Sequence, residues 1–453
     1  MPEKTLIIST SGVRGIVGSG LDPAVATNFA AAFGTFLKKG TVVVGRDSRP
    51  SGEMLKQAVI SGLQATGINV IDIGIVPTPT VEIAVTELKA AGGICITASH
   101  NPAIWNALKF FNRRGEFATP EQFDKIEKLY KSENFSFVPS KKIGKVKIQT
   151  DWIAKHIKKT LALKAVRKSA IAGRKFKIVV DAINGAGSLA LPDLLRKLGA
   201  KVYCINCNGD GNFVHGAEPV PKNLKQLGRE VLKRKADIGL ATDPDADRLA
   251  LVDEKGKAIG EELTLAIAVR EITRRFKGPT VINISTSKVT ADEAVKSGSQ
   301  VYYSKVGEAN VVQMMLKKKA VIGGEGNGGV IYPTFHAGRD ALVAAALVLS
   351  CLAGEKKKVS DLAATLSRYY TMKTKAKCPA NFNRNLKSFE NELEKFVDNP
   401  RISKLDGLRA DFPQGWLLVR KSKTEPIFRL MVETNNAKFS RELSKKVMNY
   451  FVK

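Results

Sequence analysis

Three acidic side chains, Asp243, Asp245 and Asp247, alternate along five residues of the sequence. They stand between two apolar stretches that are typical of strands, and Arg248 follows them. Carboxylates this close repel one another unless a cation neutralises them, and oxygen ligands at this density suit Mg²⁺ or Ca²⁺. An EF-hand loop is excluded, because its sixth position requires glycine and here holds Arg248. A solvated acidic turn is the alternative, but Pro244 and the flanking strands stiffen the segment, which favours metal binding.

A serine follows another apolar, strand-like stretch, in the hexapeptide TASHNP. Ser99 has His100 beside it and Lys109 ten residues further on, so it could be a nucleophile with a base nearby. No GxSxG elbow surrounds it, which makes an α/β-hydrolase a weak interpretation. A turn held by side-chain-to-backbone hydrogen bonds explains the same residues about equally well.

The glycine-rich run GEGNGG, residues 324–329, contains a formal GxGxxG pattern. A dinucleotide-binding loop needs a helix next, whereas Val-Ile-Tyr-Pro follows here, which is extended and ends at proline. We therefore expect the glycines to let the backbone approach a ligand, with Glu325 and Asn327 pointing at its hydroxyls. The sequence has no GxxxxGK[ST] run, so the motif of P-loop nucleotide hydrolases is missing.

A basic loop near the C-terminal end, RKSKTEP at residues 420–426, combines a guanidinium, hydroxyls and backbone amides. These are the groups that a phosphate dianion requires. A basic surface hairpin is an equally good explanation of this loop alone. The residues that would bind an anion here are Arg420, Ser422, Thr424 and, beyond the loop, Arg429.

Three segments of the chain share one order of elements, and each ends in one of the first three loops. Each begins with a β-branched strand and a polar loop, continues with helical periodicity, and reaches a second strand before its loop. This alternation predicts three tandem α/β domains with mixed or mostly parallel sheets, whose loops gather at the carboxyl ends of the strands. The remaining tail predicts an α+β domain. We expect the boundaries 1–150, 151–254, 255–369 and 370–453.

Composition narrows the function classes. The 453 residues suit three or four domains, and five cysteines without a dense framework of pairs indicate a reduced cytosolic protein. No signal peptide is visible, and the apolar run from Ala341 to Gly354 predicts a buried helix rather than a membrane span. The 72 basic against 43 acidic residues give a net charge of +29, which raises nucleic-acid binding as an alternative. The basic residues are spread, however, and no recognition motif accompanies them.

Taken together, the four loops resemble those of the α-D-phosphohexomutase family, which includes phosphoglucomutase, phosphomannomutase and phosphoglucosamine mutase. TASHNP resembles the phosphoserine loop, DPDADR the metal loop, GEGNGG the sugar loop and RKSKTEP the phosphate loop. Their order is the family's, and their spacing covers nearly the whole chain. Three further runs also look familial: SGVRG at residues 11–15, GRDSR at 45–49 and HGAEP at 215–219.

The resemblance implies four domains around a central cleft and a mutase that moves a phosphoryl group between the 1- and 6-positions of a hexose. It implies that Ser99 carries the phosphoryl group and also ligates Mg²⁺ together with Asp243, Asp245 and Asp247. The residues it places around the transferring group are Arg14, His100, Lys109 and Arg248. Those it assigns to the substrate are Glu325 and Asn327 for hydroxyls, and Arg420, Ser422, Thr424 and Arg429 for the non-reacting phosphate.

Some residues depart from the family pattern. Pro244 replaces the usual glycine of the metal loop, and Asn327 and Gly329 replace the common serine and histidine of the sugar loop. The GEGNGG variant, with TASHNP and WNALKF, resembles an archaeal-type branch, which slightly favours glucosamine phosphate over mannose or glucose phosphate. We expect a cytoplasmic enzyme, monomeric or homodimeric, that binds no nucleic acid and no membrane. The alternative is a non-catalytic nucleic-acid-binding protein on a mutase scaffold.

Overall fold

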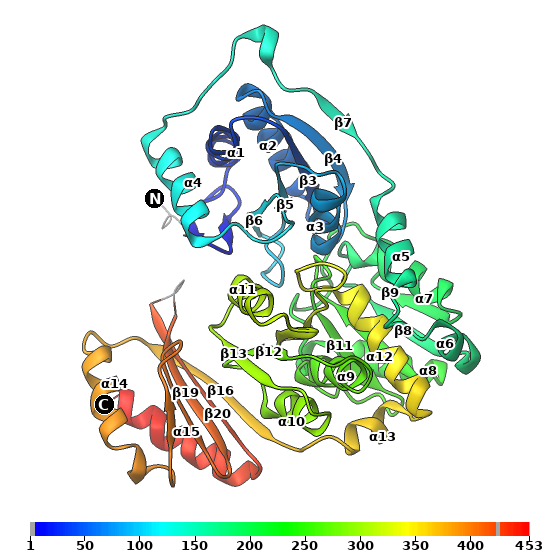
Figure 1. Ribbon diagram of the computed structural model, residues 1–453, viewed down its shortest axis with the longest axis vertical. Coiled ribbons are helices and arrows are strands. Elements are labelled where there is room, and N and C mark those ends of the chain that lie inside the picture. Colours follow the sequence, from blue (N-terminus) through cyan, green and yellow to red (C-terminus); the bar gives the residue numbers. More distant parts are fainter. Residues whose placement is uncertain (1–4, 423–425, 453) are drawn as a thin grey trace.

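The described part of the chain contains four β-sheets, one in each of four domains (Figure 1). The computed structural model describes residues 5–422 and 426–452. The first three domains are α/β, and the fourth is α+β with an antiparallel sheet. This confirms the fold class that the alternation of strand and helix patterns predicts.

The first domain is built on a seven-stranded mixed sheet in the order β1-β2-β6-β5-β3-β4-β7. Its strands are β1 (Ile7–Ser9), β2 (Gly12–Ile16), β3 (Thr41–Arg46), β4 (Asn69–Ile75), β5 (Gly92–Ile96), β6 (Trp105–Asn112) and β7 (Val146–Ile148). Its helices are α1 (Pro23–Leu37), α2 (Gly52–Ala65), α3 (Thr78–Glu87), α4 (Pro120–Ser132) and the 3₁₀ turn η1 (Ser140–Lys142). Successive side chains of β3 enter different cores: Val42 and Val44 pack toward α1 and α2, and Val43 packs toward α3. Helices therefore cover both faces of this sheet.

The second and third domains each have a four-stranded sheet, in the orders β11-β10-β8-β9 and β13-β12-β14-β15. The second contains β8 (Lys177–Asp181), β9 (Lys201–Ile205), β10 (Ile238–Thr242), β11 (Leu249–Asp253), α5 (Trp152–Ala162), α6 (Lys168–Arg174), α7 (Gly187–Lys197), η2 (Pro221–Asn223) and α8 (Lys225–Arg234). The third contains β12 (Thr280–Asn283), β13 (Val301–Ser304), β14 (Ile322–Glu325), β15 (Gly329–Ile331), α9 (Glu262–Thr273), α10 (Lys288–Lys296), α11 (Glu308–Lys318), α12 (Ala341–Glu355) and α13 (Val359–Ala364). One continuous apolar core joins the two domains.

Helix α12 lies at the centre of that shared core, and its residues from Ala341 to Ala353 are all buried. It begins where the Asp340 carboxylate accepts hydrogen bonds from the amides of Leu342 (2.8 Å) and Val343 (3.2 Å). The apolar run is therefore a core helix, as predicted. None of the helices in the described ranges combines the length and apolar character that a bilayer-spanning helix needs.

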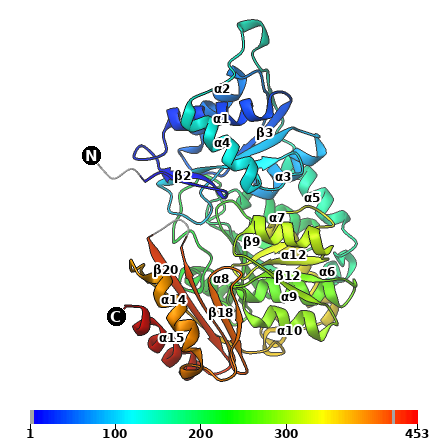
Figure 2. The ribbon, with the colours of Figure 1, turned by 60° about the vertical axis from the view of Figure 1, so that its left-hand side comes forward.

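The fourth domain is a five-stranded antiparallel sheet in the order β16-β20-β19-β18-β17, with helices α14 and α15 on one face (Figure 2). Its elements are β16 (Tyr370–Lys377), α14 (Phe382–Asn391), η3 (Leu393–Lys395), β17 (Arg401–Ser403), β18 (Leu408–Phe412), β19 (Gly415–Lys421), β20 (Ile427–Thr434) and α15 (Ala437–Val452). Alternation along β19 sends Leu417 and Val419 to the helices, and sends Trp416 and Leu418 toward Ile284 of the third domain. The face that carries Trp416 and Leu418 therefore attaches this domain to the third domain.

The three predicted loops occupy equivalent places in their sheets. Each connects an antiparallel pair at a point where the first strand also has a parallel neighbour: TASHNP joins β5 to β6, DPDADR joins β10 to β11, and GEGNGG joins β14 to β15. In such sheets ligands collect outside the carboxyl ends of the parallel strands. The architecture thus directs one polar turn from each α/β domain toward a common region.

Candidate active site

Ser99 lies in the turn between β5 and β6, with a left-handed backbone φ of 48° that residues other than glycine rarely adopt. Its N–H donates a hydrogen bond to Oγ1 of Thr97 (3.0 Å), and its Oγ donates one to Oδ2 of Asp243 (2.8 Å). The residue is 8% exposed. The hydroxyl is therefore fixed between the first domain and the acidic turn of the second.

The three aspartates lie together in the turn between β10 and β11, fully buried, with one oxygen of each within 4.8 Å of the others. Burial and the neighbouring Asp247 and Asp245 carboxylates raise the pKa of Asp243 well above its usual value. The Oδ1 atoms of Asp245 and Asp247 are also buried, yet no described residue hydrogen-bonds to either. Buried carboxylates with unpaired oxygens form a group that could hold a metal ion.

Lys109, on β6, is held against this acidic group. Its Nζ lies 2.7 Å from Oδ2 of Asp245 and 3.6 Å from Oδ2 of Asp247. Burial alone would lower the pKa of Lys109, but these two carboxylates outweigh it and raise the pKa above its usual value. Thr78, at the start of α3, donates to the same Asp245 oxygen (2.6 Å). Lys109 is therefore a fixed cation, which does not suit it to act as the base near Ser99.

His100 is the neutral group beside the serine. Its Nδ1 lies 3.5 Å from Oγ of Ser99. The charge of Arg248, burial, and the charges of Arg339 and Arg14 lower the pKa of His100 well below its usual value. The imidazole is thus uncharged near pH 7.

Two arginines complete the cationic side of the site. Arg248 places its Nε 3.8 Å from Oδ2 of Asp243 and 3.7 Å from Oδ1 of Asp247, and its Nη1 3.6 Å from Glu218. Arg14, from β2, lines the cavity, and burial and the charge of Arg248 lower its pKa. Arg14 remains charged near pH 7, because arginine titrates far above it.

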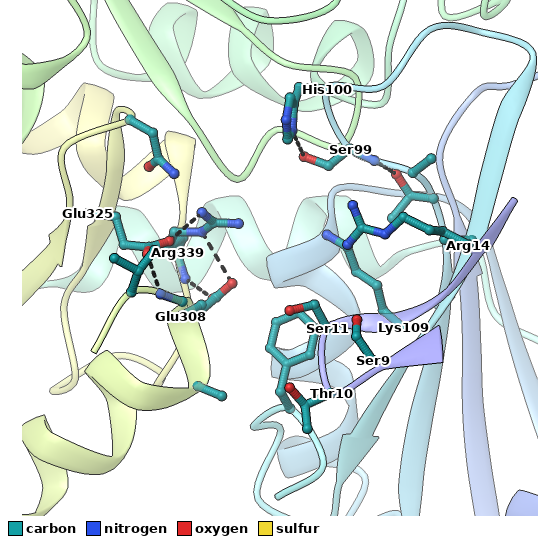
Figure 3. A pocket seen from close by; sticks show the side chains of 18 of the residues that line it. Ser9, Thr10, Ser11, Arg14, Ser99, His100, Lys109, Glu308, Glu325 and Arg339 are labelled. Carbon is teal, nitrogen blue, oxygen red and sulfur yellow. Dashed lines mark hydrogen bonds and ion pairs between the residues drawn. The ribbon is translucent and has the colours of Figure 1, made fainter. Parts of the chain in front are cut away.

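Glu325 stands at the end of β14, across the cavity from Ser99 (Figure 3). Its Oε1 accepts hydrogen bonds from Nδ2 of Asn283 (2.8 Å) and from the amide of Gly307 (2.9 Å). Its Oε2 accepts one from Nη1 of Arg339 (2.8 Å). Asn327 lines the same cavity. The glycine-rich turn is therefore an ordered wall of the site.

Arg339 joins the acidic turn to the glycine-rich turn, and sequence reasoning missed it. Besides Glu325 it contacts Oδ2 of Asp247 through Nη2 (2.6 Å) and Oε2 of Glu308 through Nε (3.2 Å). Burial opposes its charge, but Asp247, Glu308 and Glu325 raise the pKa of Arg339 further. No motif marks Arg339 in the sequence. Glu308 could have been found from the sequence, because it follows the carboxyl end of the strand β13, where ligand-binding residues collect.

A cavity of about 310 Å³ lies between these walls. Figure 3 shows Ser99, Arg14 and Lys109 on one side and Glu308, Glu325 and Arg339 on the other. Its predicted lining residues are Arg14, Ser99, His100, Lys109, Arg248, Glu325 and Asn327. The structure thus brings seven of the predicted site residues around one space, next to the acidic group.

The predicted phosphate loop belongs to the fourth domain, between β19 and β20, and contributes none of the described residues lining that cavity. Arg420 and Arg429 are opposite partners in the β19–β20 ladder, and Nη1 of Arg420 donates to Asp406 (3.3 Å). Burial lowers the pKa of Arg420, while Asp406 and Glu325 act in the opposite direction. Ser422 is buried directly after β19, and Thr424 lies outside the described residues.

Family comparisons identify all four domains in order. Phosphoglucomutase/phosphomannomutase alpha/beta/alpha domains I, II and III match residues 5–137, 154–256 and 260–369. The C-terminal domain of the same family matches residues 371–449. The matches span nearly the whole chain.

Individual relatives agree. A phosphoglucomutase/phosphomannomutase of Thermococcus kodakarensis is 40% identical over 446 residues, covering 96% of each chain. A probable phosphoglucosamine mutase of Thermococcus gammatolerans is 36% identical over 441 residues, also covering 96% of each chain. The crystal structure of a phosphoglucomutase/phosphomannomutase family protein from Burkholderia thailandensis superposes with a TM-score of 0.85 at 26% identity, covering 98% of this chain and 97% of that one.

These relatives are similar to the chain from end to end and are named as mutases, which gives the nucleic-acid-binding alternative no support. The chain belongs to the phosphoglucomutase/phosphomannomutase family and is a phosphohexomutase, an intramolecular phosphotransferase of the isomerase class.

Proposed function

We propose that the enzyme interconverts hexose 6-phosphates and hexose 1-phosphates through a phosphorylated Ser99 and a bisphosphate intermediate. The observation that carries the proposal is the 2.8 Å hydrogen bond from Ser99 Oγ to Asp243, at the edge of a cavity lined by Arg14, Lys109 and Arg248. Phosphoryl transfer needs exact positioning and neutralisation of spread negative charge, and this arrangement offers both.

We assign Mg²⁺ to the acidic turn, held by Asp243, Asp245, Asp247 and an oxygen on Ser99. The buried Oδ1 atoms of Asp245 and Asp247, which accept no hydrogen bond from the described residues, support the assignment, because a hard cation would coordinate both. The ion would supply electrostatic stabilisation of the charge that spreads over the phosphoryl oxygens.

Four side chains of the protein have the remaining roles in phosphoryl transfer. Arg14, Lys109 and Arg248 bind the phosphoryl oxygens as fixed cations. Neutral His100 accepts the proton of the attacking sugar hydroxyl and returns a proton to Ser99 Oγ. The position of His100 supports this role, because its Nδ1 lies 3.5 Å from Oγ of Ser99, the oxygen that must receive the proton.

The reaction then runs in two balanced halves. In the first, the P–Oγ bond of phosphorylated Ser99 breaks, a P–O bond to the sugar hydroxyl forms, and the hydroxyl proton ends on Ser99. The bisphosphate turns around within the cleft, and the second half returns its other phosphoryl group to Ser99. Glu325 and Asn327 bind sugar hydroxyls in both orientations. The residues assigned to the non-reacting phosphate are Arg420, Ser422, Thr424 and Arg429.

Glucosamine phosphate is the favoured substrate, with mannose and glucose phosphates close behind. The archaeal relatives named as probable phosphoglucosamine mutases support it, while the 40% identical relative carries the phosphoglucomutase/phosphomannomutase name. We also propose domain boundaries after residues 150, 254 and 369, and a cytoplasmic location. Five unpaired cysteines support the location, since oxidising compartments favour disulfides.

The proposed function is tested by turnover of glucosamine, mannose and glucose 6-phosphates side by side in Mg²⁺. ³¹P NMR resolves the product 1-phosphates directly. We expect conversion of at least one sugar, with glucosamine 6-phosphate giving the highest kcat/KM. A clear preference for glucose or mannose phosphate would overturn the substrate assignment and leave the mutase assignment in place.

A further inference from the structure

We propose that Arg49 is a positioning residue that holds the Ser99 turn in its reactive conformation. The inference rests on the proposed role of Ser99 as the phosphoryl carrier. Arg49 closes the run GRDSR, which begins in the last two residues of β3 and lines none of the described cavity surface. It is 0% exposed, so its charge must be satisfied within the protein.

The guanidinium uses all five of its N–H groups. Nε donates to Oδ2 of Asp47 (2.9 Å). The other four bonds go to carbonyl oxygens of the serine turn: Nη1 donates to Pro102 (2.6 Å) and Trp105 (2.9 Å), and Nη2 donates to Ser99 (2.6 Å) and Asn101 (2.8 Å). One side chain from another loop therefore holds together the backbone of the turn from Ser99 to Trp105.

This convergence explains why the residue is arginine. Four carbonyl oxygens turned toward one point repel one another, and a cationic donor between them offsets that cost in a buried site. Of the four, the carbonyl of Pro102 also accepts from the Trp105 amide (3.0 Å). A guanidinium offers five donors in a rigid plane, whereas a lysine ammonium offers three. The left-handed backbone at Ser99 adds to the need for hydrogen bonds that hold the turn, because this conformation is rarely populated.

Asp47 fixes the backbone amide of the same serine through Thr97. Its Oδ1 accepts a bond from the Arg49 amide (3.0 Å), and its Oδ2 accepts one from Oγ1 of Thr97 (2.6 Å). Thr97 Oγ1 in turn accepts from the Ser99 amide (3.0 Å). Both the N–H and the C=O of Ser99 are thus fixed by the Asp47–Arg49 pair, one through Thr97 and one directly.

The second domain covers this pair. The Phe213 ring centroid lies 4.9 Å from Cζ of Arg49, and Oγ of Ser48 donates to the carbonyl of Asn184 (2.7 Å). A side chain at Gly211 would collide with the carbonyl of Ser48, so the two segments pack backbone to backbone. The second domain, which also carries the acidic turn, therefore covers the Asp47–Arg49 pair that holds the serine turn.

The test compares Arg49→Lys with wild type and with Arg114→Lys, a control in the same domain whose exposed arginine pairs with Glu116. We expect Arg49→Lys to lower kcat about 100-fold with KM within about threefold, because the substrate-binding walls are untouched. We expect Arg114→Lys to match wild type. In Arg49→Ala, added guanidinium should restore kcat several-fold while equal ammonium should not.

The alternative outcomes separate this inference from the proposed function. Wild-type kcat in folded Arg49→Lys, or a change confined to KM, would overturn the positioning role and leave the mutase assignment standing. If Arg49→Lys does not fold, Asp47→Asn, which preserves volume, decides on the same criteria. Wild-type protein inactive on every hexose phosphate would overturn both.

Discussion

The hydroxyl of Ser99 donates a 2.8 Å hydrogen bond to Asp243, which lies 144 residues away in the next domain. The contact links the turn after β5 to the turn after β10. It places the proposed phosphoryl carrier beside the proposed metal ligands. Chemistry at this serine is therefore coupled to the packing of two domains.

The first prediction concerns the metal ligands. Asp245→Asn removes a charged oxygen that Mg²⁺ prefers and also weakens the contact with Lys109, so we expect the Mg²⁺ concentration for half-maximal activity to rise at least about tenfold. Asp361→Asn, at an exposed position on α13, is the matched control and should not change it. Equal activity in excess chelator and in Mg²⁺ would show that the acidic turn does not bind a required metal.

The second prediction concerns Arg339, which faces Asp247, Glu325 and Glu308. Arg339→Met leaves three buried carboxylates without their shared cation, and loss of one partner from a buried ion pair costs about 3–5 kcal/mol. We expect a loss of this order in the free energy of unfolding, measured by denaturant titration, together with loss of turnover. The free energy of unfolding of Arg339→Lys should lie between those of wild type and Arg339→Met. A Met variant as stable as wild type would mean that these carboxylates are solvated or protonated.

The sequence predicted the fold class because its strands are β-branched, its helices are amphipathic, and both patterns are local. It also predicted the acidic turn, because three carboxylates within five residues have few structural explanations. Arg339 could not be predicted in this way, since its partners come from three separate turns that meet only in the folded protein. The single core shared by the second and third domains was missed for the same reason.

The third prediction concerns a buried histidine that joins three domains. His336 lies 3.1 Å from Glu82 on α3 and 3.0 Å from Asp340, which is also 2.9 Å from His156 on α5. Burial alone would lower the pKa of His336, but its bonds to Asp340 and Glu82 raise it from 6.5 to about 10. Burial raises the pKa of Glu82 from 4.5 to about 8.

Both groups hold their protons more tightly in the folded chain than in the unfolded chain. The stability that His336 contributes is therefore complete below about pH 6.5 and is lost as the pH rises through about 10. We expect the wild-type Tm to fall over this interval and the Tm of His336→Asn to fall less. Parallel Tm profiles for the two proteins, measured by calorimetry, would show that His336 is neutral in the fold.

The fourth prediction separates the two ends of the substrate. Arg420→Ala removes a donor to the non-reacting phosphate, so kcat/KM should drop by a similar factor for all three sugars. Charge-assisted hydrogen bonds suggest a loss on the order of 1.5–3 kcal/mol, roughly ten- to a hundredfold. Glu325→Gln should instead change the ranking among sugars. Steady-state kinetics of both variants on the three sugars tests this assignment. A changed sugar preference in Arg420→Ala would mean that the phosphate loop and the sugar loop each bind the end of the substrate assigned to the other.

The most direct test of the phosphoserine mechanism is Ser99→Ala, measured by intact mass and by turnover in parallel. The wild-type protein, incubated with a hexose 1,6-bisphosphate, should carry one phosphate that the variant lacks. The variant should keep the wild-type circular dichroism spectrum, because a turn hydroxyl contributes little to packing, and should show no turnover of any hexose phosphate. Near-wild-type activity in Ser99→Ala would contradict the account, since the phosphoryl group would then have to travel by another residue.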